Sequence, residues 1–177
     1  MMLRFLASTA DVSFDEDETG STSLSASDVD GDSLEFSISD GDQITAILDG
    51  SDITFSAPTN YNGSESFIIA VTDGELTDSQ SITVTVNAVN DAPVATTGLS
   101  GTTNEDQDIV INLSGSDVDG DALTFTADTP SNGSVVVDGN IATYTPDPDY
   151  NGDDSFTFTV SDGELDDTAT VGLTIDP

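Results

Sequence analysis

The sequence contains no cysteine and no histidine, and Arg4 is its single basic residue. These absences exclude thiol nucleophiles, Ser-His-Asp triads and the usual zinc and iron sites, so only hard oxygen ligands remain for metal chemistry. Nucleic acids and anionic membranes are bound through Lys and Arg, and we therefore expect neither as a partner. Tryptophan is also absent and tyrosine is scarce, which weakens any signal for sugar stacking.

Acidic residues, by contrast, are abundant: 35 of them give a formal net charge of -34 over 177 residues. A compact chain of this charge repels itself, and divalent cations are the obvious neutralising partners. High acidity is also typical of disorder, but the alternating runs SITVTV (81–86) and SFTFTV (155–160) indicate half-buried strands. The apolar opening, residues 1–9, is too short for a signal peptide or a membrane span. It is either a truncated first strand or an added segment foreign to the repeat, and we expect no membrane insertion.

An internal repeat organises the chain. The motif DVDGD occurs at residues 28–32 and again at 117–121, an offset of 89. The same offset carries Glu-Asp (16–17), Tyr-Asn-Gly (61–63) and Asp-Gly-Glu-Leu (73–76) onto residues 105–106, 150–152 and 162–165. We therefore predict two domains, residues 1–88 and 89–177, joined tightly through NAVNDAP at residues 87–93.

Short alternating runs closed by Gly, Asn, Asp or Pro predict an all-β protein made of two tandem seven-stranded Greek-key β-sandwiches. In the second repeat we expect strands near 94–99, 108–114, 122–127, 133–137, 140–145, 155–161 and 168–175. The first repeat does not match at the equivalent of the opening strand, residues 5–10, so its N-terminal strand is atypical. The expected cores are, in order, Phe36, Phe55, Phe67, Ile69, Val71, Ile82, Val84 and Val86, and then Phe125, Tyr144, Phe156, Phe158, Val160, Val171, Leu173 and Ile175.

The DVDGD motif places carboxylates at alternate positions around a glycine, which allows them to converge on one cation. A solvated Asp-Gly turn is the alternative. An EF-hand is excluded because its loop needs Gly at position 6 and Glu at position 12, whereas here Gly is fourth and the twelfth residues are Ser39 and Asp128.

Five motifs recur in both repeats or at their joint: the Glu-Asp pair, the DVDGD turn, the YNGxxSF segment, the SDG or TDG turn, and the joint ending in VNDAP. As a set, they resemble the bacterial cadherin-like repeats of large tandem-repeat surface and adhesion proteins. The resemblance covers nearly the whole chain. It implies cadherin/Ig-like sandwiches with calcium (Ca2+) as the cofactor at the joint, bound by both repeats and by the linker.

Carried over residue by residue, the resemblance implies one shared calcium site, made by Glu16, Asn87, Asn90, Asp91, Asp117, Asp119 and Asp162. It also implies partial sites at the two ends: Asp28, Asp30 and Asp73 await a preceding linker, while Glu105 and Asp176 await a following repeat. Asn87 and Asn90 occupy positions where Asp is usual, which lowers the charge of the linker. We therefore expect fewer calcium ions at the joint, or ions that are bound more weakly. Glu65 and Asp154 could also help to bind, a question the sequence leaves open. Asp49, Asp78, Asp138, Asp166 and Asp167 are interpreted as solvated turn residues.

The sequence thus predicts a calcium-binding adhesion or spacer module of a secreted or cell-surface repeat protein, in which calcium rigidifies the joint. Its expected partners are neighbouring repeats of the same chain, with homophilic or polysaccharide contacts. A calcium-dependent carbohydrate-binding module attached to a polysaccharide-active or surface protein is the alternative. We do not expect the protein to be an enzyme. A hydrolase with paired carboxylates needs two acids set in a cleft, whereas the acidic motifs here occur on turns once in each repeat.

Overall fold

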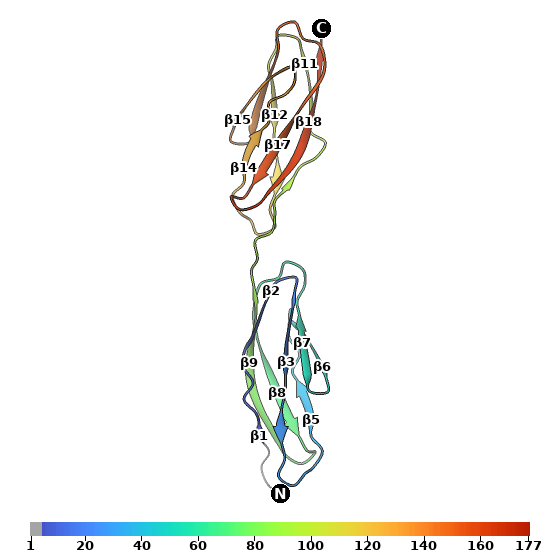
Figure 1. Ribbon diagram of the computed structural model, residues 1–177, viewed down its shortest axis with the longest axis vertical. Helices are drawn as coiled ribbons and strands as arrows, with labels where there is room; N and C mark the ends of the chain where they lie inside the picture. Colours follow the sequence, from blue (N-terminus) through green and yellow to red (C-terminus); the bar gives the residue numbers. More distant parts are fainter. Residues whose placement is uncertain (1–4) are drawn as a thin grey trace. The chain divides into compact units, whose positions relative to one another are not determined.

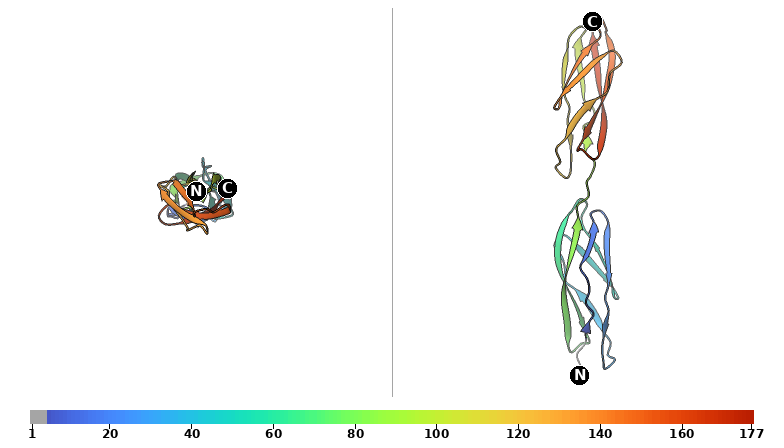
Figure 2. Two further views of the ribbon diagram at one scale, coloured as in Figure 1. Left: turned by 90° about the horizontal axis from the view of Figure 1, so that it is seen from above. Right: turned by 60° about the vertical axis from the view of Figure 1, so that its left-hand side comes forward.

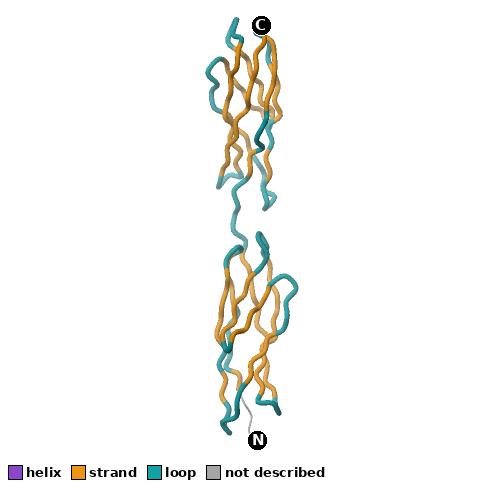
Figure 3. The backbone as a smooth tube through the Cα atoms, turned by 90° about the vertical axis from the view of Figure 1, so that its right-hand side faces the viewer, coloured by secondary structure: helices purple, strands orange, loops and turns teal. Residues whose placement is uncertain are grey.

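The computed structural model describes residues 5–177, and within that range all regular structure is β-strand (Figures 1 and 3). The chain divides into two compact units, of which the first ends at Val89 and the second begins at Asn90. In each unit the long strands run along its length and loops gather at its two ends (Figure 2). Nowhere in residues 5–177 is there a helix with the length and hydrophobicity needed to cross a bilayer.

The second unit consists of a four-stranded sheet, β11-β18-β17-β14, a three-stranded sheet, β12-β16-β15, and a short pair, β10 with β13. All pairings are antiparallel except β11 with β18, which is parallel. The strands are β10 (Val94–Ala95), β11 (Ser100–Asn104), β12 (Ile109–Asn112), β13 (Gly115–Ser116), β14 (Thr124–Ala127), β15 (Gly133–Asp138), β16 (Ile141–Pro146), β17 (Gly152–Ser161) and β18 (Asp166–Asp176).

The first unit repeats this arrangement, with sheets β2-β9-β8-β5 and β3-β7-β6 and the pair β1 with β4. Its strands are β1 (Phe5–Leu6), β2 (Val12–Asp15), β3 (Thr19–Ser23), β4 (Ala26–Ser27), β5 (Glu35–Ile38), β6 (Thr45–Asp49), β7 (Asp52–Ser56), β8 (Gly63–Thr72) and β9 (Thr77–Asn87). β8 and β9 coincide with β17 and β18 when shifted by 89 residues, so the sequence repeat is also a structural repeat.

Alternation along the long strands produces the two cores. In β9 and β18 every second side chain is buried from Ile82 and Ala169 onward, and the buried faces of the two sheets form one cluster in each unit. The predicted core residues are buried with two exceptions, Phe36 and Phe125, which are partly buried. Both lie on β5 and β14, the edge strands of their sheets, where one side has no neighbouring strand to cover the ring.

The strand count differs from the seven expected, because each unit has nine strand segments. In the second unit the expected first strand forms only at Val94–Ala95 and its continuation, β11, pairs with a different sheet. β11 was missed because SGTTN has no apolar alternation. If β10 with β11, and β12 with β13, are each counted as one interrupted strand, seven strands remain.

The opening strand of the first unit forms despite its divergent sequence. β1 pairs with β4 as β10 pairs with β13, at the same 89-residue offset. A carboxylate holds each strand: Leu6 N donates to Asp78 Oδ2 and Ala95 N donates to Asp167 Oδ2, both at 2.9 Å. The interpretation of Asp78 and Asp167 as merely solvated turn residues was therefore wrong, because both bind backbone far away in the sequence.

Candidate metal centre

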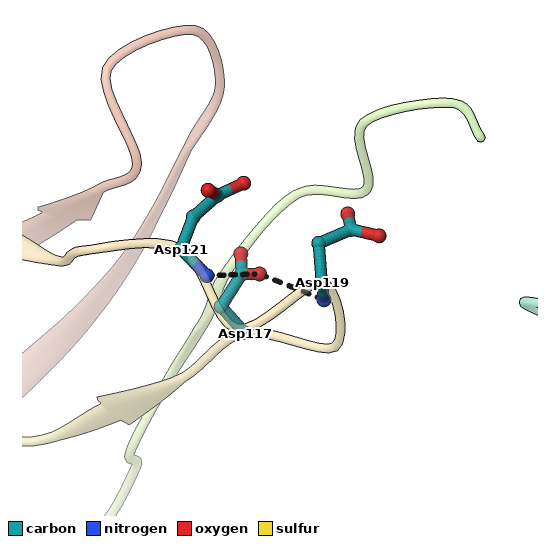
Figure 4. A group of neighbouring side chains, drawn as sticks. All are labelled: Asp117, Asp119 and Asp121. Atoms are coloured by element: carbon teal, nitrogen blue, oxygen red, sulfur yellow. Dashed lines mark hydrogen bonds between the residues drawn. The ribbon is translucent and has the colours of Figure 1, made fainter.

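The DVDGD segment follows β13 and folds around its first aspartate (Figure 4). Asp117 Oδ1 accepts the backbone N–H groups of Asp119, Gly120 and Asp121 at 2.9, 3.0 and 3.3 Å. Gly120 has φ of 82°, a left-handed conformation that glycine adopts without steric cost. The sequence therefore folds into a tight loop that turns the later carboxylates back toward the first.

This loop brings three carboxylates together. Oxygen atoms of Asp117, Asp119 and Asp121 lie within 4.8 Å of one another, and this is the one acidic group of its kind within residues 5–177 (Figure 4). Asp117 Oδ2 is buried and accepts no hydrogen bond from any residue that the structure describes. Asp121 belongs to the cluster although the resemblance did not assign it as a ligand, and its place in the DVDGD motif was the signal for it.

A second turn supplies Asp162. Its Oδ1 accepts the N–H groups of Glu164 and Leu165, both at 2.7 Å, and its Oδ2 accepts the side-chain amide of Asn90 at 2.9 Å. The pKa of Asp162 is lowered, first by the Leu165 N–H, then by the Asn90 amide and the Glu164 N–H, since all three stabilise the ionised carboxylate. The carboxylate is therefore held in the charged form that a metal requires.

The segment that opens the second unit reaches both turns. Besides the Asn90 contact to Asp162, the backbone N–H of Asp91 donates to Asp119 Oδ2 at 2.8 Å. The structure thus brings together five predicted ligands that belong to the second unit, namely Asn90, Asp91, Asp117, Asp119 and Asp162.

In the first unit, Glu16 lies beside the end of β9. Its backbone N–H donates to Asn87 O at 2.9 Å, and its Oε1 accepts the Val89 N–H at 2.7 Å. The side chain is only 5% exposed, and Oε2 is buried without a hydrogen bond from any described residue. Asn87 is exposed and donates its amide to Asp15 Oδ1 at 3.0 Å.

The remaining predicted ligands occupy the equivalent positions of the repeat. Asp28 Oδ1 accepts the N–H groups of Asp30, Gly31 and Asp32, and Asp73 Oδ1 accepts those of Glu75 and Leu76, as in the second unit. Glu105 donates its N–H to Asp176 O at 2.7 Å and is partly buried. Asp28 and Asp73 therefore organise turns equivalent to those of Asp117 and Asp162 in the second unit.

The donor set fits a hard divalent cation. Residues 5–177 contain no Lys, Arg or His, so no side chain in that range can form an ion pair with these carboxylates. The buried oxygens Asp117 Oδ2 and Glu16 Oε2 accept no hydrogen bond from the described residues, although burying such an atom is costly without a partner. Calcium takes carboxylate, amide and backbone oxygens, which are the groups present here.

Glu65 and Asp154, left open by the sequence, have a structural role. Glu65 Oε1 accepts the N–H groups of Gln43 and Ile44, at 2.7 and 3.2 Å, and Oε2 accepts that of Asp42 at 2.9 Å. Asp154 Oδ2 accepts the Asn132 N–H and the Tyr144 hydroxyl, both at 2.9 Å. Each carboxylate therefore holds the loop before a strand in place through these hydrogen bonds.

A comparison with sequence families identifies the repeats. The family model of the bacterial Ig domain matches residues 5–85 and 90–174. The chain belongs to this family. It carries two tandem copies of the bacterial Ig domain, in agreement with the resemblance to bacterial cadherin-like tandem repeats. No curated protein sequence matches the chain significantly.

Solved structures similar to these bacterial Ig repeats include cadherins. Drosophila N-cadherin EC1-4 matches with a TM-score of 0.63 and 14% identity, over 99% of this chain and 50% of that one. Human protocadherin-24 EC1-2 (form II) matches with a TM-score of 0.60 and 14% identity, over 88% and 87%. The endo-fucoidan hydrolase MfFcnA4 of glycoside hydrolase family 107 has 23% identity and a TM-score of 0.41, and this chain spans 28% of it. At these identities the likeness concerns the fold.

Proposed function

We propose that the two bacterial Ig repeats form a calcium-binding spacer or adhesion module, without catalytic activity, of a secreted or cell-surface repeat protein. The observation that carries the proposal is the buried, hydrogen-bond-free Oδ2 of Asp117 within a cluster of three carboxylates that no basic side chain of residues 5–177 can neutralise. A bound cation would offset this charge and give the buried oxygen a partner.

In the second repeat the oxygens of Asp117, Asp119, Asp162 and Asn90 are the proposed ligands. The resemblance to cadherin-like repeats further leads us to propose Glu16, Asn87 and Asp91 as ligands of the same ion, so that calcium would join the two repeats. Coordination would then replace carboxylate repulsion and restrict the swing about residues 87–93. Sites in extracellular modules bind calcium at about 10⁻⁴ to 10⁻³ M, which suits an ion that is abundant outside the cell.

The test is thermal unfolding of the whole chain in chelator and in millimolar calcium. Calcium should raise the unfolding midpoint strongly for the wild type, and much less for the double variant Asp117→Ala with Asp119→Ala. The matched control is Asp49→Ala with Asp138→Ala, which removes the same charge from two exposed hairpin aspartates and should keep the full calcium response. An equal response of both double variants would refute the site.

A pocket in the second repeat favours carbohydrate binding as a second candidate. It has a volume of about 640 Å³ and is lined by Leu113, Ser114, Gly115, Leu123, Thr124, Phe125, Gly139 and Asn140. None of these side chains is charged, although acids dominate the composition. A partly buried phenyl ring beside hydroxyl and amide groups is suited to a neutral oligosaccharide rather than to an anion.

The pocket lies on both flanks of the DVDGD loop, since Leu113 to Gly115 precede that loop and Leu123 to Phe125 follow it. Ordering of the loop by calcium would therefore also order the pocket walls. Titration with neutral oligosaccharides should show binding that Phe125→Ala removes, whereas Phe36→Ala, at the equivalent position of the first repeat, leaves it intact. Equal loss in both variants, or no binding in wild type, removes this candidate.

A further inference from the structure

The first residues of the second repeat donate hydrogen bonds to carboxylates of the candidate metal centre. Asn90 Nδ2 donates to Asp162 Oδ2 at 2.9 Å, and Asp91 N donates to Asp119 Oδ2 at 2.8 Å. Two consecutive residues thus attach to two separate turns, one after β13 and one between β17 and β18. Both bonds are charge-assisted, because each acceptor is a carboxylate.

The chemistry of these donors matters because the acids have few other partners. Residues 5–177 contain no basic side chain, so the positive partial charge near Asp119 and Asp162 comes from N–H groups. An asparagine at position 90 can donate a hydrogen bond to Asp162, whereas an aspartate there would bring a second negative charge to a carboxylate 2.9 Å away. Asparagine therefore suits the metal-free state.

Calcium reverses this preference. A carboxylate ligand contributes a full charge to a cation and an amide oxygen only a dipole, and ligand charge sets affinity in oxygen sites. The hydrogen bond from Asn90 also occupies one lone pair of Asp162 Oδ2. An asparagine at position 90 should thus weaken the site for calcium while it keeps the segment attached in its absence.

We propose that Asn90 is a latch that keeps the joint segment docked on the second repeat when calcium is absent and that lowers the calcium affinity of the site. The calcium half of this proposal rests on the proposed function, and the docking half does not. Of the two asparagines in the joint, Asn87 donates instead to Asp15, which is not a predicted ligand.

The experiment compares the whole chain as wild type, Asn90→Asp, Asn90→Asp with Asp162→Asn, and Asn112→Asp. The second variant exchanges donor and acceptor, because an asparagine at position 162 can accept the turn N–H groups through its oxygen and donate to the new carboxylate. Asn112 is an exposed residue of β12, so its substitution controls for the added charge. Asn90→Ala removes the donor without adding charge, in case Asn90→Asp does not fold.

Amide hydrogen exchange of Asp91, measured in chelator, tests the docking half. Exchange should become about tenfold faster in Asn90→Asp, return to near the wild-type rate in the exchanged pair, and stay unchanged in Asn112→Asp, since loss of a charge-assisted bond opens the segment locally. Calcium titration tests the other half, with affinity expected to rise about tenfold in Asn90→Asp because of its extra carboxylate ligand.

The two halves fail separately. An unchanged exchange rate in Asn90→Asp and Asn90→Ala overturns the latch, whatever calcium does. If the exchange rates follow the expected order but no variant binds calcium, the docking stands and the proposed calcium function fails. If calcium binds with equal affinity to wild type and Asn90→Asp, the role of Asn90 in affinity is overturned.

Discussion

Single carboxylates in this protein accept hydrogen bonds from backbone N–H groups and thereby hold loops in place. Glu65 and Asp154 show how the two repeats reach the same result with different side chains. In the second repeat Asp154 shares Oδ2 with the hydroxyl of Tyr144, which is fully buried. In the first repeat Phe55 stands at the equivalent of Tyr144 and cannot donate, and there the longer Glu65 gives both oxygens to backbone N–H groups.

Burial alone would raise the pKa of Asp154. Hydrogen bonds outweigh the effect of burial and lower the pKa; the donors are the Ser155 N–H, the Tyr144 hydroxyl, and the Asn132 and Ser131 N–H groups. Because the folded pKa lies below the unfolded one, the carboxylate contributes stability above the ordinary aspartate pKa of about 3.9. That contribution is lost as the pH falls through the lower folded pKa.

Asp154→Asn should therefore lower the free energy of unfolding of the second repeat by about 1–3 kcal/mol at neutral pH, because the amide turns a donor toward other donors. Urea unfolding at neutral and acidic pH measures the effect, and the difference from wild type should shrink in acid. Asp138→Asn, exposed at the end of β15, should change stability by less than about 0.5 kcal/mol at either pH. A pH-independent loss would contradict the assignment.

Among the structural elements, the DVDGD loop depends on the backbone of its glycine. A Cβ at Gly120 meets no atom within 4 Å, so φ of 82° is the only obstacle to a side chain. Gly120→Ala should cost about 1–2 kcal/mol, the penalty of a left-handed L-residue, and should weaken calcium binding because the cluster depends on this loop.

Gly172 in β18 provides the matched control for Gly120→Ala. Its Cβ would also meet open space, but its φ lies outside the left-handed range. Gly172→Ala should be neutral or stabilise the repeat by up to about 1 kcal/mol, through the lower entropy of the unfolded chain. Chemical unfolding of both variants decides the point, and equal losses would show that the left-handed φ of Gly120 is not the cause of the penalty.

The two-residue strands β1 and β10 have too few ladder bonds to persist alone, and each is also held by a carboxylate near the start of a long strand, Asp78 of β9 and Asp167 of β18. The pKa of Asp167 is lowered, first by the Ala95 N–H, then by the Thr168 N–H. Asp167→Ala should therefore release β10 while the rest of the second repeat stays folded. Hydrogen exchange of Ala95 should accelerate about tenfold, as expected when a bond to a charged group is lost.

Asp167→Asn separates the hydrogen bond from the charge, because its amide oxygen can still accept from Ala95. This variant should retain much of the protection that Asp167→Ala loses. If both variants exchange at the wild-type rate, the pairing of β10 with β13 is sufficient and the carboxylate is not needed.

For the molecule as a whole, the net charge of -34 is the dominant electrostatic fact. In chelator, the unfolding midpoint should rise as sodium chloride is increased, because screening weakens repulsion between acids at distances near the Debye length of about 10 Å at 0.1 M. Millimolar calcium should raise the midpoint more than sodium chloride of equal ionic strength. Equal effects at equal ionic strength would leave only a screened acidic surface, without a specific site.

The sequence by itself determined the fold class, the repeat and most of both cores, because period-two alternation and an exact 89-residue offset are local properties that read directly as strands and copies. It also selected the motif residues around Asp117 and Glu16. The sequence did not predict strand β11 or the partial exposure of Phe125, because both depend on which strands are neighbours in the sheet.

Only the tertiary structure decided which acids bind backbone and which retain unused oxygens. In sequence, Asp167, Asp154 and Asp117 are similar aspartates near turns. In space, Asp167 accepts the N–H of a residue 72 positions away, Asp154 accepts the Tyr144 hydroxyl, and Asp117 buries an oxygen that accepts no hydrogen bond from a described residue. The physical reason is that carboxylates have four lone-pair sites but no fixed partner, so their roles depend on the donors that folding brings to them.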